Sequence, residues 1–389
     1  MYIAILGRQP ELGIAELERV FGGNAVKPVS PQTVTIETDS FDVQRFGGVP
    51  KAGKIIFELQ RSDWHQISQK IVNYFANEWS TFMGKITLGI SAYDIDISPR
   101  EVQKTGIILK QKLKKYNVSL RLIPNTESSL NTAVSHHNKL GLSDNKIELL
   151  IVRADDGRII VASSTGAQNI TAYAKRDQER PKRDAFVGML PPKLAQIMLN
   201  LAVSGSNKPL RVLDPFCGTG VILQESLLMG YSAYGTDLSE KMANYSDENL
   251  DWLSRGYQQE FDYKLGVGDA MTYKWQQPID AVVCESYLGQ PFSAPPSPTK
   301  LVEVRENCDR IITEFLRNIG GQIKPGTPIC IAIPAWRDVH GHFTHLPLIE
   351  TVGRFGFKRH EFMNVSQNDL LYYRENQVVA RELLVLTKI

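Results

Sequence analysis

An aspartate followed closely by two glycines ends an apolar run in the middle of the chain. The run RVLD leads from Arg211 to Asp214 and continues as PFCGTG, with a helix predicted to begin near Val221. Gly218 and Gly220 allow the backbone to approach a ligand closely and to adopt angles that other residues avoid. A helix N-terminus favours a carboxylate, and Asp214 favours an ammonium group. The pattern predicts a site for the amino-acid end of S-adenosylmethionine.

Two further carboxylates follow at the ends of later apolar runs. Asp237 in YGTDLS is placed to accept hydrogen bonds from both ribose hydroxyls, and Asp269 in GDA is placed to meet the adenine amino group. A nucleotide-binding Rossmann fold is the competing interpretation. The third glycine of GxGxxG is missing, however, and no GxxxxGKS or GxxxxGKT loop occurs. The cofactor-binding residues predicted from these stretches are Asp214, Phe216, Gly218, Gly220, Asp237, Leu238, Asp269 and Ala270.

The elements that must position these residues alternate between strand and helix. The strands RVLD, SAYGTD, YKLGVGD, DAVVCE and PICIAIP are separated by helical stretches, which predicts a doubly wound, mostly parallel α/β sheet over residues 186–389. Two late segments, 369–373 and 379–387, are expected to form an antiparallel pair at the sheet edge. Residues 166–185 show no apolar period and are predicted to be a linker.

The preceding part of the chain predicts two small α+β domains. Residues 1–61 contain strands and a helix over Glu11–Phe21, consistent with a ferredoxin-like unit. Residues 62–165 contain further strands and a long helix from Ser98 to Tyr116, for which Ser98-Pro99 is a good N-terminal signal.

Several of these motifs resemble a known enzyme family. DPFCGTG, with the upstream FVGMLPPKLAQIMLNLA at residues 186–202, resembles the tRNA guanosine N2-methyltransferases that modify position 10 in archaea and eukaryotes. The N-terminal GRQPELGIAELERVFGG is also similar to this family, and residues 62–165 are similar to a THUMP domain, an RNA-binding module of tRNA-modifying enzymes. The resemblance covers essentially the whole chain.

The resemblance implies a Rossmann-like class I methyltransferase domain that uses S-adenosylmethionine, with tRNA as partner. In the family, a turn and helix similar to GMLPPKLA pack over the methionine end of the cofactor, which implies cofactor contacts for Met189 and Pro191. Some relatives also require a small activating protein subunit.

The chain departs from the family at the catalytic signature. Where the family has Asp-Pro-Pro-Tyr, this sequence reads ESYL, so that Glu285 replaces the acid and Leu288 the aromatic residue in direct register. With a one-residue gap, Tyr287 takes the aromatic place instead. An exocyclic amine is a poor nucleophile until two acceptors hold its N–H groups and orient it. Glu285 can supply a carboxylate, Ser286 a carbonyl and Tyr287 a stacking surface.

Other functions stay open at this point. ESYL also fits a strand-end loop in a non-catalytic protein that binds tRNA, and the cofactor motifs also suit a methyltransferase acting on ribosomal RNA or DNA. The proline-rich stretch QPFSAPPSPT at residues 290–299 is either a spacer or a lid over the target base.

Two basic stretches are candidates for phosphate contacts. The stretch at 175–184 carries five basic against three acidic residues, and the helix from Ser98 ends in KQKLKKY. A solvated mixed-charge linker, and lysines that suit the end of a helix dipole, are the simpler interpretations. The predicted RNA-binding residues are Lys110, Lys114, Lys115, Lys175, Arg176, Arg180, Lys182 and Arg183.

Net charge, apolar runs and the cysteine and histidine content further limit the classes of function that the sequence allows. The formal charge is only +2, so nucleic-acid binding must be argued from local charge. The sequence shows no secretory signal, and no apolar run approaches the roughly 20 residues of a membrane span. The four cysteines are scattered, which predicts neither disulfides nor a cysteine zinc site and indicates a reducing, cytoplasmic location. His340, His342 and His345 lack further ligands at suitable spacing, so no metal is predicted.

Overall fold

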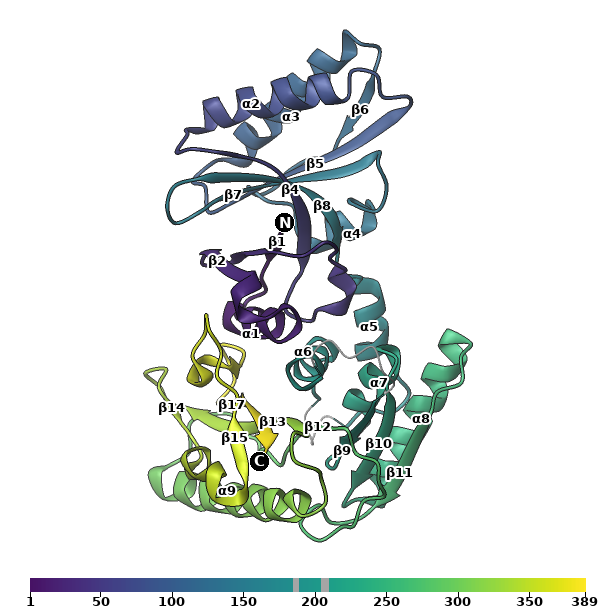
Figure 1. Cartoon of the computed structure of the whole chain (residues 1–389), viewed down its shortest axis with the longest axis vertical. Coiled ribbons are helices and arrows are strands. Elements are labelled where there is room, and N and C mark those ends of the chain that lie inside the picture. Colours follow the sequence, from purple (N-terminus) through teal and green to yellow (C-terminus); the bar gives the residue numbers. More distant parts are fainter. Residues whose placement is uncertain (185–188, 204–209) are drawn as a thin grey trace. The chain divides into compact units, whose positions relative to one another are not determined.

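The computed structural model describes residues 1–184, 189–203 and 210–389 of the chain. These residues form two compact units (Figure 1). The first unit contains Met1–Pro10 and Gly23–Ala172, and the second contains Glu11–Gly22 and Tyr173–Ile389. Phe186, the predicted first residue of the catalytic domain, lies outside the described residues.

The described residues of the first unit share one eight-stranded sheet, in the order β2-β3-β1-β4-β8-β7-β5-β6. β4 pairs antiparallel with β1 on one side and with β8 on the other. The predicted boundary between residues 61 and 62 therefore falls inside a single sheet. The strands are β1 (Tyr2–Ile5), β2 (Val26–Ser30), β3 (Thr33–Ile36), β4 (Lys51–Leu59), β5 (Lys85–Tyr93), β6 (Ser119–Leu122), β7 (Lys146–Arg153) and β8 (Ile159–Ala167).

Two amphipathic helices, α2 (Trp64–Glu78) and α3 (Pro99–Lys114), lie side by side over one face of this sheet (Figure 1). The predicted start of α3 is confirmed, because the Ser98 side chain accepts a hydrogen bond from the Glu101 amide. Asp63 and Gln66 form a capping box at the start of α2. The shorter elements are η1 (Gly23–Ala25), η2 (Val43–Arg45) and α4 (Thr132–His137).

The structure differs from the predicted linker at residues 166–185. Strand β8 extends to Ala167, and helix α5 covers Ile170–Gln178. Tyr173 and Arg176, three residues apart, form the buried side of this helix. The buried position of Arg176 carries a charge, so the helix has no apolar period to detect in the sequence.

The second unit confirms the predicted doubly wound, mostly parallel sheet. Its described strands run in the order β11-β10-β9-β12-β13-β17-β15, with β14 paired to β13 and β16 to β17. The late pair β16–β17 is antiparallel as predicted, but β17 lies between β13 and β15 rather than at the edge. The strands are β9 (Arg211–Asp214), β10 (Ser232–Asp237), β11 (Tyr263–Val267), β12 (Ala281–Glu285), β13 (Pro328–Arg337), β14 (Phe343–Thr344), β15 (Phe357–Arg359), β16 (Leu371–Tyr372) and β17 (Val379–Lys388).

Alternate residues of these strands enter two cores on opposite faces of the sheet. Cys284 of β12 and Leu384 of β17 pack on the face covered by α9 (Pro298–Gly320) and η3 (Pro347–Phe355). Val283 and Leu383 pack on the face covered by α6 (Pro192–Ala202) and the start of α7 (Val221–Leu228). The remaining elements are α8 (Glu240–Tyr257) and η4 (Gln367–Asp369). Among the described residues, no helix is long and apolar enough to cross a membrane.

Helix α1 (Pro10–Phe21) belongs to the second unit, although the sequence predicted it in a domain of residues 1–61. Arg19 Nε donates to the Leu201 carbonyl at 2.8 Å. The Glu18 carboxylate accepts the amides of Met363 and Asn364 at 2.7 and 2.6 Å. Leu12 joins the core around α6. The helix is amphipathic in sequence, but its partners lie far along the chain.

Candidate cofactor and acceptor site

The turn after β9 is tight and has left-handed backbone at two positions. Gly218 has φ +51° and Gly220 has φ +82°, a region that favours glycine. A Cβ atom at Gly220 would lie 2.9 Å from the Ser246 hydroxyl oxygen. That hydroxyl donates to the Gly218 carbonyl at 2.9 Å and so fixes the turn against α8. The positive φ angles therefore explain why glycine occupies both positions.

The Asp237 carboxylate is fixed by two backbone donors. One oxygen accepts the Gly218 amide and the other accepts the Ser239 amide, both at 2.9 Å. Each carboxylate oxygen can accept a further hydrogen bond, so both can still receive a ribose hydroxyl. This carboxylate therefore links the cofactor turn to the end of the next strand.

Replacing Asp237 by alanine is expected to weaken S-adenosylmethionine binding by about 10- to 100-fold, because hydrogen bonds to a charged group are among the strong ones. The substitution also removes the hydrogen bond from the Gly218 amide to the Asp237 carboxylate, which holds the cofactor turn in place. Isothermal calorimetry measures the change, with Asp262→Ala, just before β11, as the control. Unchanged affinity would remove Asp237 from the ribose role.

The loop after β11 meets the same edge of the sheet. The Gly268 amide donates to the Asp237 carbonyl at 2.9 Å, and the Asp269 carboxylate accepts the Met271 amide at 2.9 Å. Ala270 is buried, whereas the Leu238 side chain is 73% exposed. The structure thus brings the three predicted acid-bearing loops to adjacent strand ends. The adenine contact of Asp269 and the cofactor contacts of Leu238 and Ala270 stay predictions.

Asp214 is 2% exposed, and its carboxylate accepts the Phe216 amide at 3.1 Å. Burial raises the pKa of this carboxyl well above its usual range, the Phe216 amide opposes the shift, and the Asp237 and Glu285 carboxylates add to it. Three carboxylates therefore interact in one site. Such a site fits a ligand with an ammonium and a sulfonium group, as S-adenosylmethionine has.

Replacing Asp214 by asparagine is expected to stabilise the cofactor-free protein while weakening cofactor binding. A carboxyl whose pKa is raised on folding contributes stability below its unfolded pKa and loses it as the pH rises through the folded pKa. The gain in the free energy of unfolding should therefore be larger at pH 8 than at pH 4. Denaturant titration at both pH values measures it. An equal effect at both would contradict the assigned burial cost.

The other predicted cofactor residues lie nearby in the fold, and their contacts with the cofactor stay predictions. Phe216 is partly buried and meets the Phe315 ring edge-on, with centroids 5.2 Å apart. Met189 and Pro191 are partly buried, and Pro191 is the N-cap of α6. Residues 186–188 of the family-like stretch lie outside the described residues.

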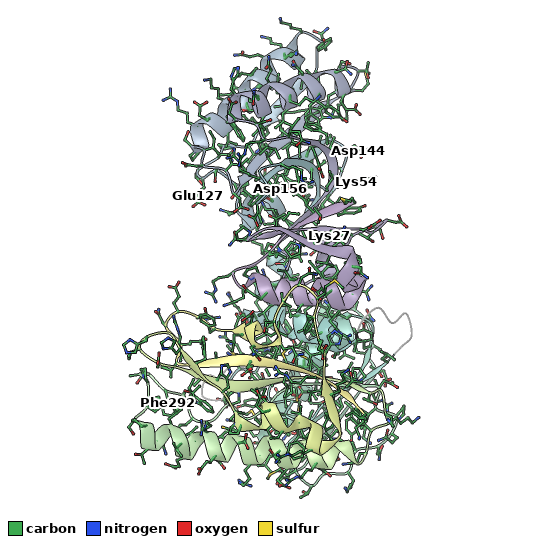
Figure 2. The ribbon with its side chains drawn as sticks, turned by 60° about the vertical axis from the view of Figure 1, so that its left-hand side comes forward. Lys27, Lys54, Glu127, Asp144, Asp156 and Phe292 are labelled. Atoms are coloured by element: carbon green, nitrogen blue, oxygen red, sulfur yellow. The ribbon has the colours of Figure 1, made fainter. Side chains whose placement is uncertain are left out.

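The predicted acceptor residues stand at the end of β12. The Ser286 amide and hydroxyl both donate to the Ala332 carbonyl of β13, at 3.0 and 2.9 Å, while Tyr287 is 43% exposed. Phe292 of the proline-rich stretch lies beside α9 (Figure 2) and packs against the core there. The Glu285 carboxylate forms an ion pair with Arg381 of β17. Arg381 was not predicted as a site residue, although a charged pair inside the apolar run of VVARELLVL was a detectable signal.

Two of the predicted phosphate contacts are wrong for this structure. Arg176 is 8% exposed and its guanidinium holds the Glu225 carboxylate at 2.6 and 3.1 Å, and Arg180 is 2% exposed. Both side chains are buried within the second unit, to which the residues from Tyr173 onward belong. The other predicted residues keep solvent access: Lys182 is half-buried, and the exposed ones are Lys110, Lys114, Lys115, Lys175 and Arg183. In the described parts of the chain, no cluster of histidine, cysteine, aspartate or glutamate could hold a metal ion.

The proteins to which this chain is similar in sequence are methyltransferases, in agreement with the S-adenosylmethionine site described above. Residues 180–284 match the UPF0020 family, an RMKL-like methyltransferase domain. The tRNA (guanine(10)-N2)-dimethyltransferase of Methanothermobacter thermautotrophicus is 25% identical over 348 residues, 87% of this chain and 90% of the relative. The enzyme of the same name from Methanocaldococcus jannaschii is 27% identical over 257 residues, 63% of this chain and 69% of the relative.

Among solved structures, TrmN from Thermus thermophilus has a TM-score of 0.53 at 16% identity and covers 100% of this chain and 99% of that one. At this identity the likeness shows the fold alone. By its fold and its sequence relatives, the chain is an S-adenosylmethionine-dependent class I methyltransferase, similar along most of its length to the tRNA (guanine(10)-N2)-dimethyltransferases.

Proposed function

We propose that the protein transfers methyl groups from S-adenosylmethionine to the exocyclic N2 of guanosine 10 in tRNA, in the cytoplasm. The observation that carries the proposal is the Glu285 carboxylate, which stands at the end of β12 beside the cofactor strand β9 and interacts with Asp214. The names of the sequence relatives support tRNA as the substrate.

The three residues after Cys284 have distinct roles in this proposal. The free oxygen of Glu285 and the carbonyl of Ser286 accept the two N–H groups of the target amine, and the Tyr287 ring stacks on the guanine. The cofactor supplies an electrophilic methyl group. With the cofactor bound, the amine nitrogen would form a bond to that carbon as the carbon–sulfur bond breaks, the thioether S-adenosylhomocysteine would leave, and the nitrogen would lose one proton to solvent.

RNA binding is proposed for the first unit and for the accessible basic residues. Residues 62–165 act as a THUMP-like module, attached to the predicted N-terminal region of residues 1–61. Lys110, Lys114 and Lys115 are exposed near the end of α3, and Lys175, Lys182 and Arg183 precede the catalytic region. Phosphate contacts from such residues add affinity without sequence preference.

Nucleoside mass spectrometry tests the proposal. Unmodified tRNA is incubated with the protein and S-adenosylmethionine carrying a labelled methyl group, and the modified position is then mapped. We expect N2-methylguanosine or N2,N2-dimethylguanosine at position 10, and no label in a tRNA with adenosine there. Label in ribosomal RNA or DNA instead would contradict the tRNA assignment. Cofactor binding without methylation of any nucleic acid would favour a non-catalytic binding protein.

A further inference from the structure

The guanidinium of Arg381 is the partner of the proposed acceptor carboxylate. Arg381 Nε donates to Glu285 Oε1, and the two residues form an ion pair. Arg381 is 7% exposed. The contact engages Oε1 and leaves Oε2 to accept a hydrogen bond from another donor. The ion pair therefore occupies one oxygen of the Glu285 carboxylate, and the other oxygen can accept a hydrogen bond from a substrate.

Sheet geometry explains how residues on β12 and β17 meet across the intervening strand β13. Glu285 lies opposite Ala332 of β13, and Ala332 lies opposite Leu383 of β17. The two strands on either side of β13 are roughly 10 Å apart, at the usual strand spacing. The alanine side chain leaves room above β13, and the long side chains of glutamate and arginine close the distance. An aspartate at position 285 would be one methylene shorter.

Side chains alternate between the two faces of the sheet along β17, so the neighbouring residues Arg381 and Glu382 point to opposite faces. Arg381 shares the face of Leu383 and Val385, the face on which Glu285 follows Val283. Glu382 points to the other face, where its carboxylate meets His345 Nδ1 at 2.7 Å. Arg381 is therefore directed to the acceptor site by the register of β17 with β13.

We infer that Arg381 is a positioning residue for methyl transfer: it holds Glu285 Oε1 and thereby aims Oε2 at the acceptor amine. The inference rests on the proposed function of Glu285. The longer acid in ESYL, compared with the family's aspartate, needs a fixed side-chain conformation to act as an acceptor. The guanidinium provides that bond, and it places a positive charge beside a carboxylate that also interacts with Asp214. The low exposure of Arg381 disfavours a direct contact with an RNA phosphate.

Four single-turnover rates test the inference, for the wild type, Arg381→Met, Glu285→Ala and the double variant, with labelled cofactor and tRNA both saturating. Arg381→Met is expected to lower the rate about 100-fold, the scale of a misplaced acceptor, with unchanged dissociation constants for cofactor and tRNA. In the Glu285→Ala background the same change should alter the rate less than about twofold, because no carboxylate remains to be aimed. Arg310→Met, which replaces an exposed arginine on α9, is the matched control.

An equal loss in both backgrounds would overturn the inference, as would a wild-type rate in Arg381→Met or a weakened tRNA affinity as its main effect. If Arg381→Met does not fold, Arg381→Lys replaces it in the cycle, with a smaller expected loss when Glu285 is present and none in the Glu285→Ala background. The proposed function can fail independently of this inference. A methyl group on another nucleoside would contradict guanosine N2 as the acceptor, while the four rates would still decide the role of Arg381.

Discussion

Glu285→Ala is expected to lower the rate of methyl transfer by about 100- to 1000-fold, the usual effect of removing one oriented group that stabilises a transition state. The lone pair of the guanine amine is delocalised into the ring, and the carboxylate acts by accepting an N–H group as the nitrogen turns toward the methyl carbon. Cofactor affinity should change little, because the cofactor turn is held by Asp237 and Ser246.

The measurement pairs single-turnover rates with calorimetry of cofactor binding. Glu285→Ala also leaves the Arg381 guanidinium buried without its partner, so a lower unfolding midpoint is expected and must be measured with the rate. Glu303→Ala, on the exposed side of α9, is the control for removing a glutamate. A wild-type rate in Glu285→Ala would remove this residue from the acceptor role.

Arg176→Met is expected to lower the free energy of unfolding of the second unit by about 3–5 kcal/mol, the typical cost of removing one partner of a buried ion pair. Glu225 is almost fully buried on α7, and its carboxylate would lose the positive charge with which it forms an ion pair in the wild type. Burial already raises the pKa of the Glu225 carboxyl, with Arg176 opposing that shift. Without Arg176 the carboxyl should take up a proton more readily, so the loss should be largest at high pH and smaller as the pH falls.

Denaturant titration at two pH values measures this loss. Lys175→Met is a matched control, since the neighbouring lysine is exposed. The double variant Arg176→Met, Glu225→Leu should recover most of the stability, because an apolar pair of similar volume can replace a buried ion pair. A loss for Arg176→Met no larger than that for Lys175→Met would show that the ion pair contributes little.

The features of the fold that the sequence predicted correctly are local. The order of strand, Asp214, glycines and helix is contiguous, and so is the cap formed by Ser98 at the start of α3, because a few neighbouring residues determine each of them. Asp237 could be assigned to a strand end because the alternation of strands and helices repeats along the second unit.

What could not be predicted depends on partners distant in the chain. The charge of Arg176 indicates a surface residue until Glu225 on α7 is seen to bind it. The pairing of Arg381 with Glu285 requires the position of β17 between β13 and β15, and composition does not determine strand order. Helix α1 has an apolar side that suits either unit, so its amphipathic pattern alone does not select the second.

The placement of α1 has a consequence for biosynthesis. Glu18 is synthesised 345 residues before its partner Met363 and 346 residues before its partner Asn364. At typical elongation rates this delay is on the order of tens of seconds. The strands on either side of α1, β1 and β2, can each pair with β3 in the meantime, whereas the second unit cannot be completed until Met363 and Asn364 have been synthesised. A contiguous fragment beginning after Ala172 would lack this helix, so that fragment is not the whole folding unit.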